Sequence, residues 1–178
     1  GKPDPDQLGL VQVYTGNGKG KTTASLGLAM RALGHGYSVL MIQFMKGDAG
    51  YGEVQFSRTI RNFSIVQSGL TTFVEKGAPS KQDMELAEKG FTAALKAARS
   101  GSHDLLILDE VLVAVDYGLI GEEMLRKLIT EKAARTELIL TGRYCTPEVA
   151  AMADLVSEVC EKKHPFKKGV GGRKGIEY

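Results

Sequence analysis

A glycine-rich stretch near the start of the chain, Thr15 to Thr23 with the sequence TGNGKGKTT, carries the residues best suited to chemistry. Glycines in such a turn let successive backbone N–H groups point inward, and the lysine that follows them reaches the terminal phosphates of a nucleotide. Thr15 stands where this motif usually opens with glycine, but Gly16, one position later, can serve the turn. The stretch therefore predicts a loop that binds Mg²⁺ and a nucleoside triphosphate.

Most of the expected nucleotide contacts lie in the loop itself. Lys21 would contact the β- and γ-phosphates, and the Thr22 hydroxyl would bind Mg²⁺. The full set of expected loop contacts is Gly16, Asn17, Gly18, Lys19, Gly20, Lys21, Thr22 and Thr23.

An apolar run that ends in Asp109 and Glu110 supports this prediction. A carboxylate at the end of a buried strand can reach the metal beside a phosphate-binding loop. We therefore expect Asp109 and Glu110 at the metal site. The alternative is that the two acids simply meet solvent at the end of the strand.

Two periodicities along the chain predict the elements that must position these residues. Short apolar runs alternate with stretches of helical period, which is typical of an α/β domain with a mainly parallel sheet flanked by helices. Strands are expected over residues 10–14, 38–44, 63–67, 105–109, 137–141 and 156–161. Helices are expected over residues 21–36, 80–100, 121–135 and 146–153. Residues 45–58, residues 68–80 and the C-terminal tail fit neither pattern and follow strand ends, where open α/β sheets bind ligands.

The composition fits one soluble domain, because 43% of the 178 residues are hydrophobic and 25% are charged. No apolar run approaches the roughly 20 residues that span a bilayer, and a net charge of +2 gives little attraction to nucleic acid. Neither a membrane nor a nucleic acid is therefore expected as a partner. The polar start of the chain shows no secretory pattern, so a cytoplasmic location is expected. We divide the chain into a leader (1–9), the phosphate-loop domain (10–163) and a C-terminal tail (164–178).

These residues leave the reaction open. An ATPase or small-molecule kinase needs a group that orients water or a hydroxyl, and Glu110 could serve. A nucleotide-gated binding module without catalysis is a further alternative.

Several strings resemble the ATP:corrinoid adenosyltransferases of the CobA/BtuR/CobO type: GLVQVYTGNGKGKTTASLGLAMRALGHG, VLMIQFMKG, LLILDE, LILTGR and KHPFKKGVGGRKGIEY. The resemblance spans essentially the whole chain and implies a single-domain, RecA-like phosphate-loop NTPase fold. It also implies transfer of the 5′-deoxyadenosyl group of ATP to the Co(I) of a reduced corrinoid, such as cobalamin, cobinamide or a precursor, with triphosphate as the leaving group. The implied cofactor is Mg²⁺, the implied electron donor is a flavoprotein, and the implied assembly is a homodimer.

The resemblance also implies roles for individual residues. Lys21, Glu110 and Arg143 would be the catalytic residues, with Glu110 favoured over Asp109 as metal ligand. Arg31 and Arg143 would face the phosphates, although a solvated helix residue is the alternative for Arg31.

Two further regions complete the site that the resemblance implies. His164 and Phe166, in the tail, would close over the nucleotide. Leu70 and Phe73 would cover one face of the corrin, at the place where enterobacterial members carry Phe-Thr-Trp, and the chain contains no tryptophan. Core packing is the alternative for Leu70 and Phe73.

Overall fold

The computed structural model describes residues 4–178, and within that range six parallel strands form one sheet in the order β3-β2-β4-β5-β1-β6. The strands are β1 (Val11–Thr15), β2 (Val39–Phe44), β3 (Phe63–Ser68), β4 (Leu105–Asp109), β5 (Glu137–Thr141) and β6 (Leu155–Glu158). The first strand follows a short 3-10 helix, η1 (Pro5–Gln7), and a second one, η2 (Pro165–Lys168), lies in the tail.

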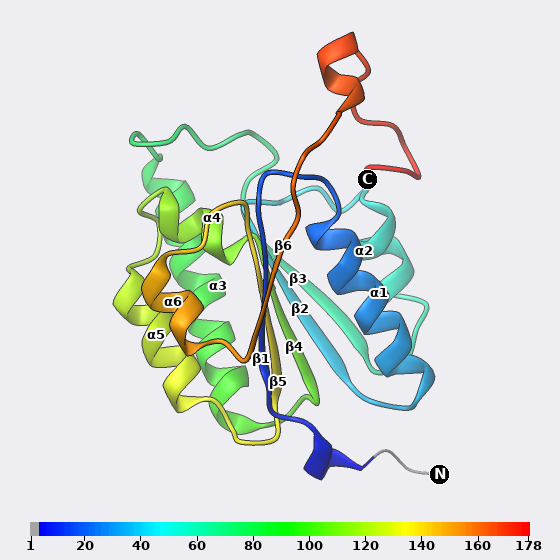
Figure 1. The fold of residues 1–178 in the computed structure, drawn as a ribbon, viewed down its shortest axis with the longest axis vertical. Helices are drawn as coiled ribbons and strands as arrows, with labels where there is room; N and C mark the ends of the chain where they lie inside the picture. Colours follow the sequence, from blue (N-terminus) through cyan, green and yellow to red (C-terminus); the bar gives the residue numbers. More distant parts are fainter. Residues whose placement is uncertain (1–3) are drawn as a thin grey trace.

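Helices cover both faces of this sheet (Figure 1). One face carries α1 (Lys21–Gly34) and α2 (Gly52–Ser57), and the other carries α3 (Lys81–Ser100), α4 (Val111–Asp116), α5 (Glu122–Glu131) and α6 (Pro147–Met152). The expected single α/β domain with a parallel sheet is therefore confirmed.

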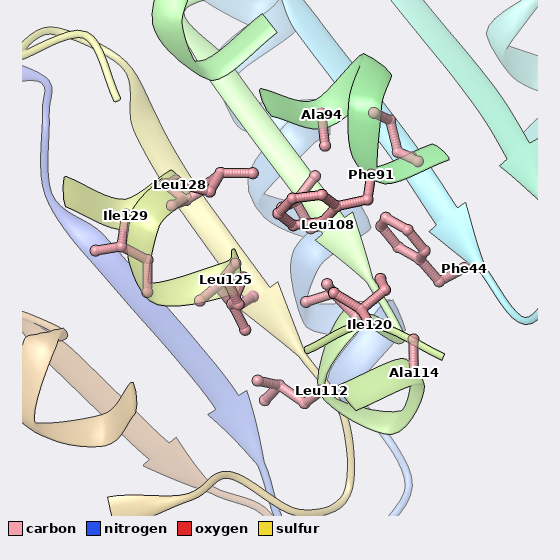
Figure 2. Close-up of a cluster of buried hydrophobic side chains, with 14 of the residues drawn as sticks. Phe44, Phe91, Ala94, Leu108, Leu112, Ala114, Ile120, Leu125, Leu128 and Ile129 are labelled. Carbon is pink, nitrogen blue, oxygen red and sulfur yellow. The ribbon is translucent and has the colours of Figure 1, made fainter. Parts of the chain in front are cut away.

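The central strand β4 shows how the sheet is buried on both faces. All five of its residues are buried, as is usual for parallel strands between two helical layers. Leu106 and Leu108 belong to the core cluster beneath α3 and α5, and Leu105 and Ile107 belong to the cluster beneath α1. Figure 2 shows the first cluster, in which Leu108 lies near Phe91 of α3. This packing fixes the end of β4, where the two acids stand.

Capping residues set the ends of two helices as the sequence indicates. Ser80 and Asp83 form a capping box at the start of α3, with the Ser80 hydroxyl accepting from the Asp83 N–H at 3.0 Å. Gly101 ends α3 in the left-handed conformation. Thr146 accepts from the N–H of Val149 at the start of α6.

The structure departs from the predicted elements at several places. Helices α2 and α4 were not predicted, because each has only six residues and shows too little periodicity. Strand β6 ends at Glu158 and not at residue 161, since its partner β1 ends opposite it at Thr15. Helix α5 ends at Glu131, before residue 135, because the backbone of Lys132 is extended.

The expected leader, residues 1–9, falls only partly within the structure. Residues 1–3 lie outside the described residues, and the remainder contains the 3-10 helix Pro5–Gln7. Across residues 4–178, none of the helices combines the length and the apolar character that a bilayer crossing requires.

Candidate nucleotide-binding site

The glycine-rich loop connects β1 to α1 and lies against the segment that follows β6. Gly16 and Gly20 have φ values of 102° and 125°, which side chains rarely allow. A Cβ on Gly16 would lie 2.3 Å from the carbonyl oxygen of Val159, so only glycine fits there. The N–H of Gly18 donates to the same carbonyl at 2.8 Å. The backbone after β6 therefore holds the loop in its curled shape.

Lys21 places its ammonium group inside this curl. Its Nζ donates to the carbonyl oxygens of Gly16 and Gly18, both at 2.7 Å. Burial lowers the pKa of Lys21, and the negative charge of Glu110 partly offsets that effect. The loop thus holds a partly buried cation at the N-terminus of α1, where the helix dipole also favours anions.

Asp109 connects the loop to the centre of the sheet. This carboxylate is fully buried and accepts hydrogen bonds from the hydroxyls of Thr22 and Thr141, each at 2.8 Å. Its other oxygen lies 2.6 Å from Nζ of Lys46. Lys46 Nζ also lies 3.5 Å from the Thr22 hydroxyl. The structure thus brings the two expected residues Thr22 and Asp109 into hydrogen-bond contact, and the ammonium group of Lys46 contacts both of them.

Lys46 is a site residue that the sequence did not single out. It stands just beyond β2, in one of the segments expected to line a ligand site, and Met45 before it turns the chain with a φ of 66°. Burial is the largest single influence and opposes its charge, but the charge and hydrogen bond of Asp109, together with the charges of Glu110 and Glu53, outweigh burial and raise the pKa of Lys46. The sequence offered only a lysine in the segment after a predicted strand, and the pairing of that strand with β4 became apparent only in the structure.

Glu110 is the first residue after β4 and directs its side chain toward the same pocket as the loop. Its backbone is left-handed, with a φ of 61°, and its N–H donates to the Thr141 hydroxyl at 2.9 Å. Burial raises the pKa of Glu110, and the negative charge of Asp109 raises it further. The positive charges of Lys46, then Lys21, and last the exposed Arg143 act in the opposite sense. The adjacent carboxylates of Asp109 and Glu110 favour binding of a cation at this place.

A cavity of about 580 Å³ lies over these groups, a volume that suits a small-molecule ligand. The loop residues 18–23 form one side, and Lys46 and Glu110 lie in its wall. His164 and residues 175–178 of the tail form another part of the wall. In Figure 1 the tail rises over the carboxyl end of the sheet, where the loop lies.

Two contacts join the end of the tail to the site. The Glu177 carboxylate lies 2.7 Å from Lys19 Nζ and 3.0 Å from Arg173 Nη2. Hydrogen bonds from Arg173 and then from Lys19 lower the pKa of Glu177 to about 2. The ring of Tyr178 has its centre 6.2 Å from that of Tyr51. The tail residues 175–178 and Tyr51 were not among the predicted site residues.

The start of the tail lies beside the loop as well. His164 Nδ1 accepts from the N–H of Phe166 at 3.0 Å, and Phe166 is largely exposed. Both residues line a smaller cavity, of about 270 Å³, that also includes Asn17 and Lys19. Asn17 accepts from the N–H of Glu161 at 3.0 Å, so it holds the segment just before the tail to the loop.

Comparison with known proteins places this site in a family. A KaiC-like protein from Pyrococcus horikoshii OT3 has a similar fold, with a TM-score of 0.56 and 19% identity over 92% of this chain and 76% of that one. A corrinoid adenosyltransferase from Sinorhizobium sp. is 34% identical over 97% of this chain and 82% of its own length. One from Escherichia coli (strain K12) is 34% identical over 97% of this chain and 87% of its own length. A profile of the ATP:corrinoid adenosyltransferases BtuR/CobO/CobP matches residues 7–178.

The chain belongs to the ATP:corrinoid adenosyltransferase family. This family consists of transferases, and the RecA-like phosphate-loop fold expected for this adenosyltransferase chain is confirmed.

Some residues that the resemblance implied do not line the main cavity of this adenosyltransferase chain, namely Arg143, which is exposed just beyond β5, Phe166, which lines the smaller cavity, and Arg31, Leu70 and Phe73. Arg31 is exposed in the last turn of α1 and lines a separate cavity of about 180 Å³ with His35 and Tyr37. Leu70 and Phe73 lie in the connection between β3 and α3, and neither lines the nucleotide cavity. Phe73 is fully exposed and therefore does not pack in the core.

The oxygen atoms at this adenosyltransferase site fit Mg²⁺. Within residues 4–178, no group of three or more His, Cys, Asp or Glu side chains could hold a metal ion by itself. A metal beside a phosphate-binding loop needs fewer protein ligands, because phosphates and waters supply the others. The Thr22 hydroxyl and the carboxylates of Asp109 and Glu110 are the hard oxygen donors that Mg²⁺ prefers.

Proposed function

We propose that the chain transfers the 5′-deoxyadenosyl group of Mg²⁺-bound ATP to the Co(I) of a reduced corrinoid, with triphosphate as the leaving group. The observation that supports the nucleotide half is the cavity that Lys21, Thr22 and Glu110 line together at the N-terminus of α1, with the buried Asp109 carboxylate directly behind Thr22. The corrinoid half rests on membership of the adenosyltransferase family.

The residues of the loop would act on the leaving group. In this step a cobalt–carbon bond forms at C5′, the C5′–oxygen bond breaks, and its electron pair leaves with the triphosphate. No proton transfer is needed. The inward N–H groups and Lys21 would stabilise the negative charge that develops on the triphosphate. Bound Mg²⁺, held by Thr22 with Glu110 and Asp109, would neutralise part of the same charge.

Other groups would orient the substrates. Lys19 and Arg143 would add positive charge near the phosphates, and His164 with Phe166 would close the tail over the nucleotide. The exposed Phe73, together with Leu70, would cover one face of the corrin. Alignment of C5′ with cobalt is where such a protein gains most of its rate, because the nucleophile needs no activation by a base.

Three parts of the proposal rest on the family relationship and the sequence. These are a homodimeric assembly, a cytoplasmic location and reduction of the corrinoid by a flavoprotein.

Product analysis tests the proposal. The full chain is incubated with ATP, Mg²⁺ and a corrinoid that a chemical reductant keeps as Co(I), and the products are separated under red light. We expect triphosphate and a light-sensitive alkylcorrinoid in equal amounts. Formation of ADP in place of triphosphate would identify an ATPase, if free phosphate is the second product, or a kinase, if the phosphoryl group is on an acceptor. ATP binding without turnover would identify a binding module. Each of these results would overturn the proposal.

A pair of lysine variants shows whether the loop is the site of binding. Lys21→Ala removes the ammonium inside the curl and should weaken ATP binding by about 10- to 100-fold, because charged hydrogen bonds contribute about 1.5–3 kcal/mol. Lys76→Ala, which removes a largely exposed lysine paired with Asp116, is the matched control and should bind ATP normally. Isothermal titration calorimetry with a non-hydrolysable ATP analogue gives both affinities.

A further inference from the structure

Lys46 lies between the two groups that a phosphate-loop metal would use. Its ammonium is 2.6 Å from Asp109 Oδ2 and 3.5 Å from the Thr22 hydroxyl. Thr22 in turn donates to the other oxygen of Asp109 at 2.8 Å. A cation of the protein itself therefore contacts both the hydroxyl and the carboxylate.

The backbone fixes this position of Lys46. Strand β2, which ends just before Met45, pairs in register with β4, so that Gln43 lies opposite Asp109. The lysine side chain is only 19% exposed, and Asp109 is 0% exposed, so water screens their attraction weakly. Gly69 packs against this turn, since a Cβ there would lie 2.5 Å from the N of Lys46. The ammonium is thus part of the built site and not a mobile surface charge.

We propose that Lys46 is an internal cation that competes with Mg²⁺ for Asp109 and Thr22. A divalent ion placed beside the ammonium would experience strong repulsion in this poorly screened place. Triphosphate changes that balance, because its negative charges compensate both cations. Mg²⁺ therefore enters this site only together with the triphosphate, and the protein selects the metal–nucleotide complex over the free metal ion.

This inference rests on the nucleotide site of the proposed function, but it does not depend on the corrinoid. Its test uses no corrinoid and measures no turnover. A failed adenosylation assay and a failed metal assay therefore remain distinguishable.

The experiment measures Mn²⁺ binding to the full chain without nucleotide, by electron paramagnetic resonance of the free ion. Lys46→Met removes the charge and retains most of the side-chain volume. We expect Lys46→Met to bind Mn²⁺ at least about tenfold more tightly than the wild type, because removal of one neighbouring charge relieves the repulsion. Lys46→Arg should bind as weakly as the wild type, and Lys76→Met, the same change at an exposed ion pair, should have no effect.

Two outcomes would overturn the proposal. The first is an equal affinity of the wild type and Lys46→Met for Mn²⁺. The second is tight Mn²⁺ binding by the wild type itself without nucleotide, which decides the question even if Lys46→Met does not fold. A second measurement uses inorganic triphosphate in excess EDTA. If Lys46→Met binds inorganic triphosphate about tenfold or more weakly than the wild type, while its Mn²⁺ affinity is unchanged, Lys46 is a phosphate ligand instead.

Discussion

Asp109→Asn tests how much the buried ion pair contributes to the fold. Asparagine keeps an oxygen that can accept from Thr22 and Thr141, so the two hydroxyl contacts can persist. It cannot neutralise Lys46, whose Nζ lies 2.6 Å from the carboxylate in the wild type. The variant therefore isolates the loss of one charge at a position that is 0% exposed.

The magnitude follows from the burial of both partners. Removal of one partner from a buried ion pair usually costs about 3–5 kcal/mol. The low end, about 3 kcal/mol, applies here, because Lys46 is 19% exposed and Glu110 remains nearby as a second acid. For a chain of 178 residues this corresponds to a fall in Tm of about 6–12 °C.

Urea unfolding and calorimetry without nucleotide give both quantities. The double variant Asp109→Asn with Lys46→Met should lose clearly less stability than the sum of the two single changes, since no buried charge of the pair then remains. Lys76→Ala, which breaks an exposed pair, should change the free energy of unfolding by less than about 1 kcal/mol. The reasoning is refuted if Asp109→Asn unfolds within about 1 kcal/mol of the wild type, or if the two changes simply add.

Three other predictions concern separate regions. Gly90→Ala should destabilise the chain by about 1–3 kcal/mol in urea unfolding despite a gain in helix propensity, because the new Cβ would lie 2.3 Å from Ser68 Oγ. Adding Ser68→Gly to this variant should restore the free energy of unfolding. If it does not, the predicted clash is not the cause. Burial lowers the pKa of His103, and the negative charge of Asp104 opposes this effect. The unfolded chain therefore binds more protons at His103 than the folded chain, so the free energy of unfolding falls as the pH drops through about 6.5. His103→Gln should flatten that slope in Tm measurements. Phe73→Ala should leave ATP affinity unchanged and slow only the reaction that starts from Co(II) corrinoid; equal effects on both would contradict its assignment to the corrin side.

The phosphate-binding loop could be predicted because its information is local. The glycines, Lys21 and Thr22 stand within a few residues of one another, and the structure keeps them together. Asp109 is far away in sequence, but an apolar strand that ends in an acid is also a local pattern. Lys46 carries no such pattern. Its place beside Asp109, 63 residues further along, follows from the pairing of β2 with β4, which the sequence does not specify.

Arg31 shows the opposite case, in which helix geometry could have corrected an expectation. An α-helix rises about 1.5 Å per residue, so a residue near the end of α1 lies on the order of 15 Å from Lys21 along the axis. The family resemblance suggested a phosphate contact, and the spacing along the helix argues against one. The tail is a different matter, because the contact of Glu177 with Lys19 joins residues 158 positions apart and no local rule predicts it.

The left-handed backbone at Glu110 has a consequence for evolution toward heat resistance. A left-handed backbone at a residue with a long side chain costs about 1 kcal/mol or more in conformational free energy, and glycine or asparagine at that position would lower this cost. Selection for thermal tolerance alone should therefore accumulate Gly or Asn at residue 110. Selection that also requires turnover should retain the acid, given the role proposed for Glu110. Two variant libraries, one selected for thermal tolerance alone and one selected for both properties, would then differ in the frequency of Gly and Asn at residue 110. That difference would measure the trade-off between stability and activity at this position.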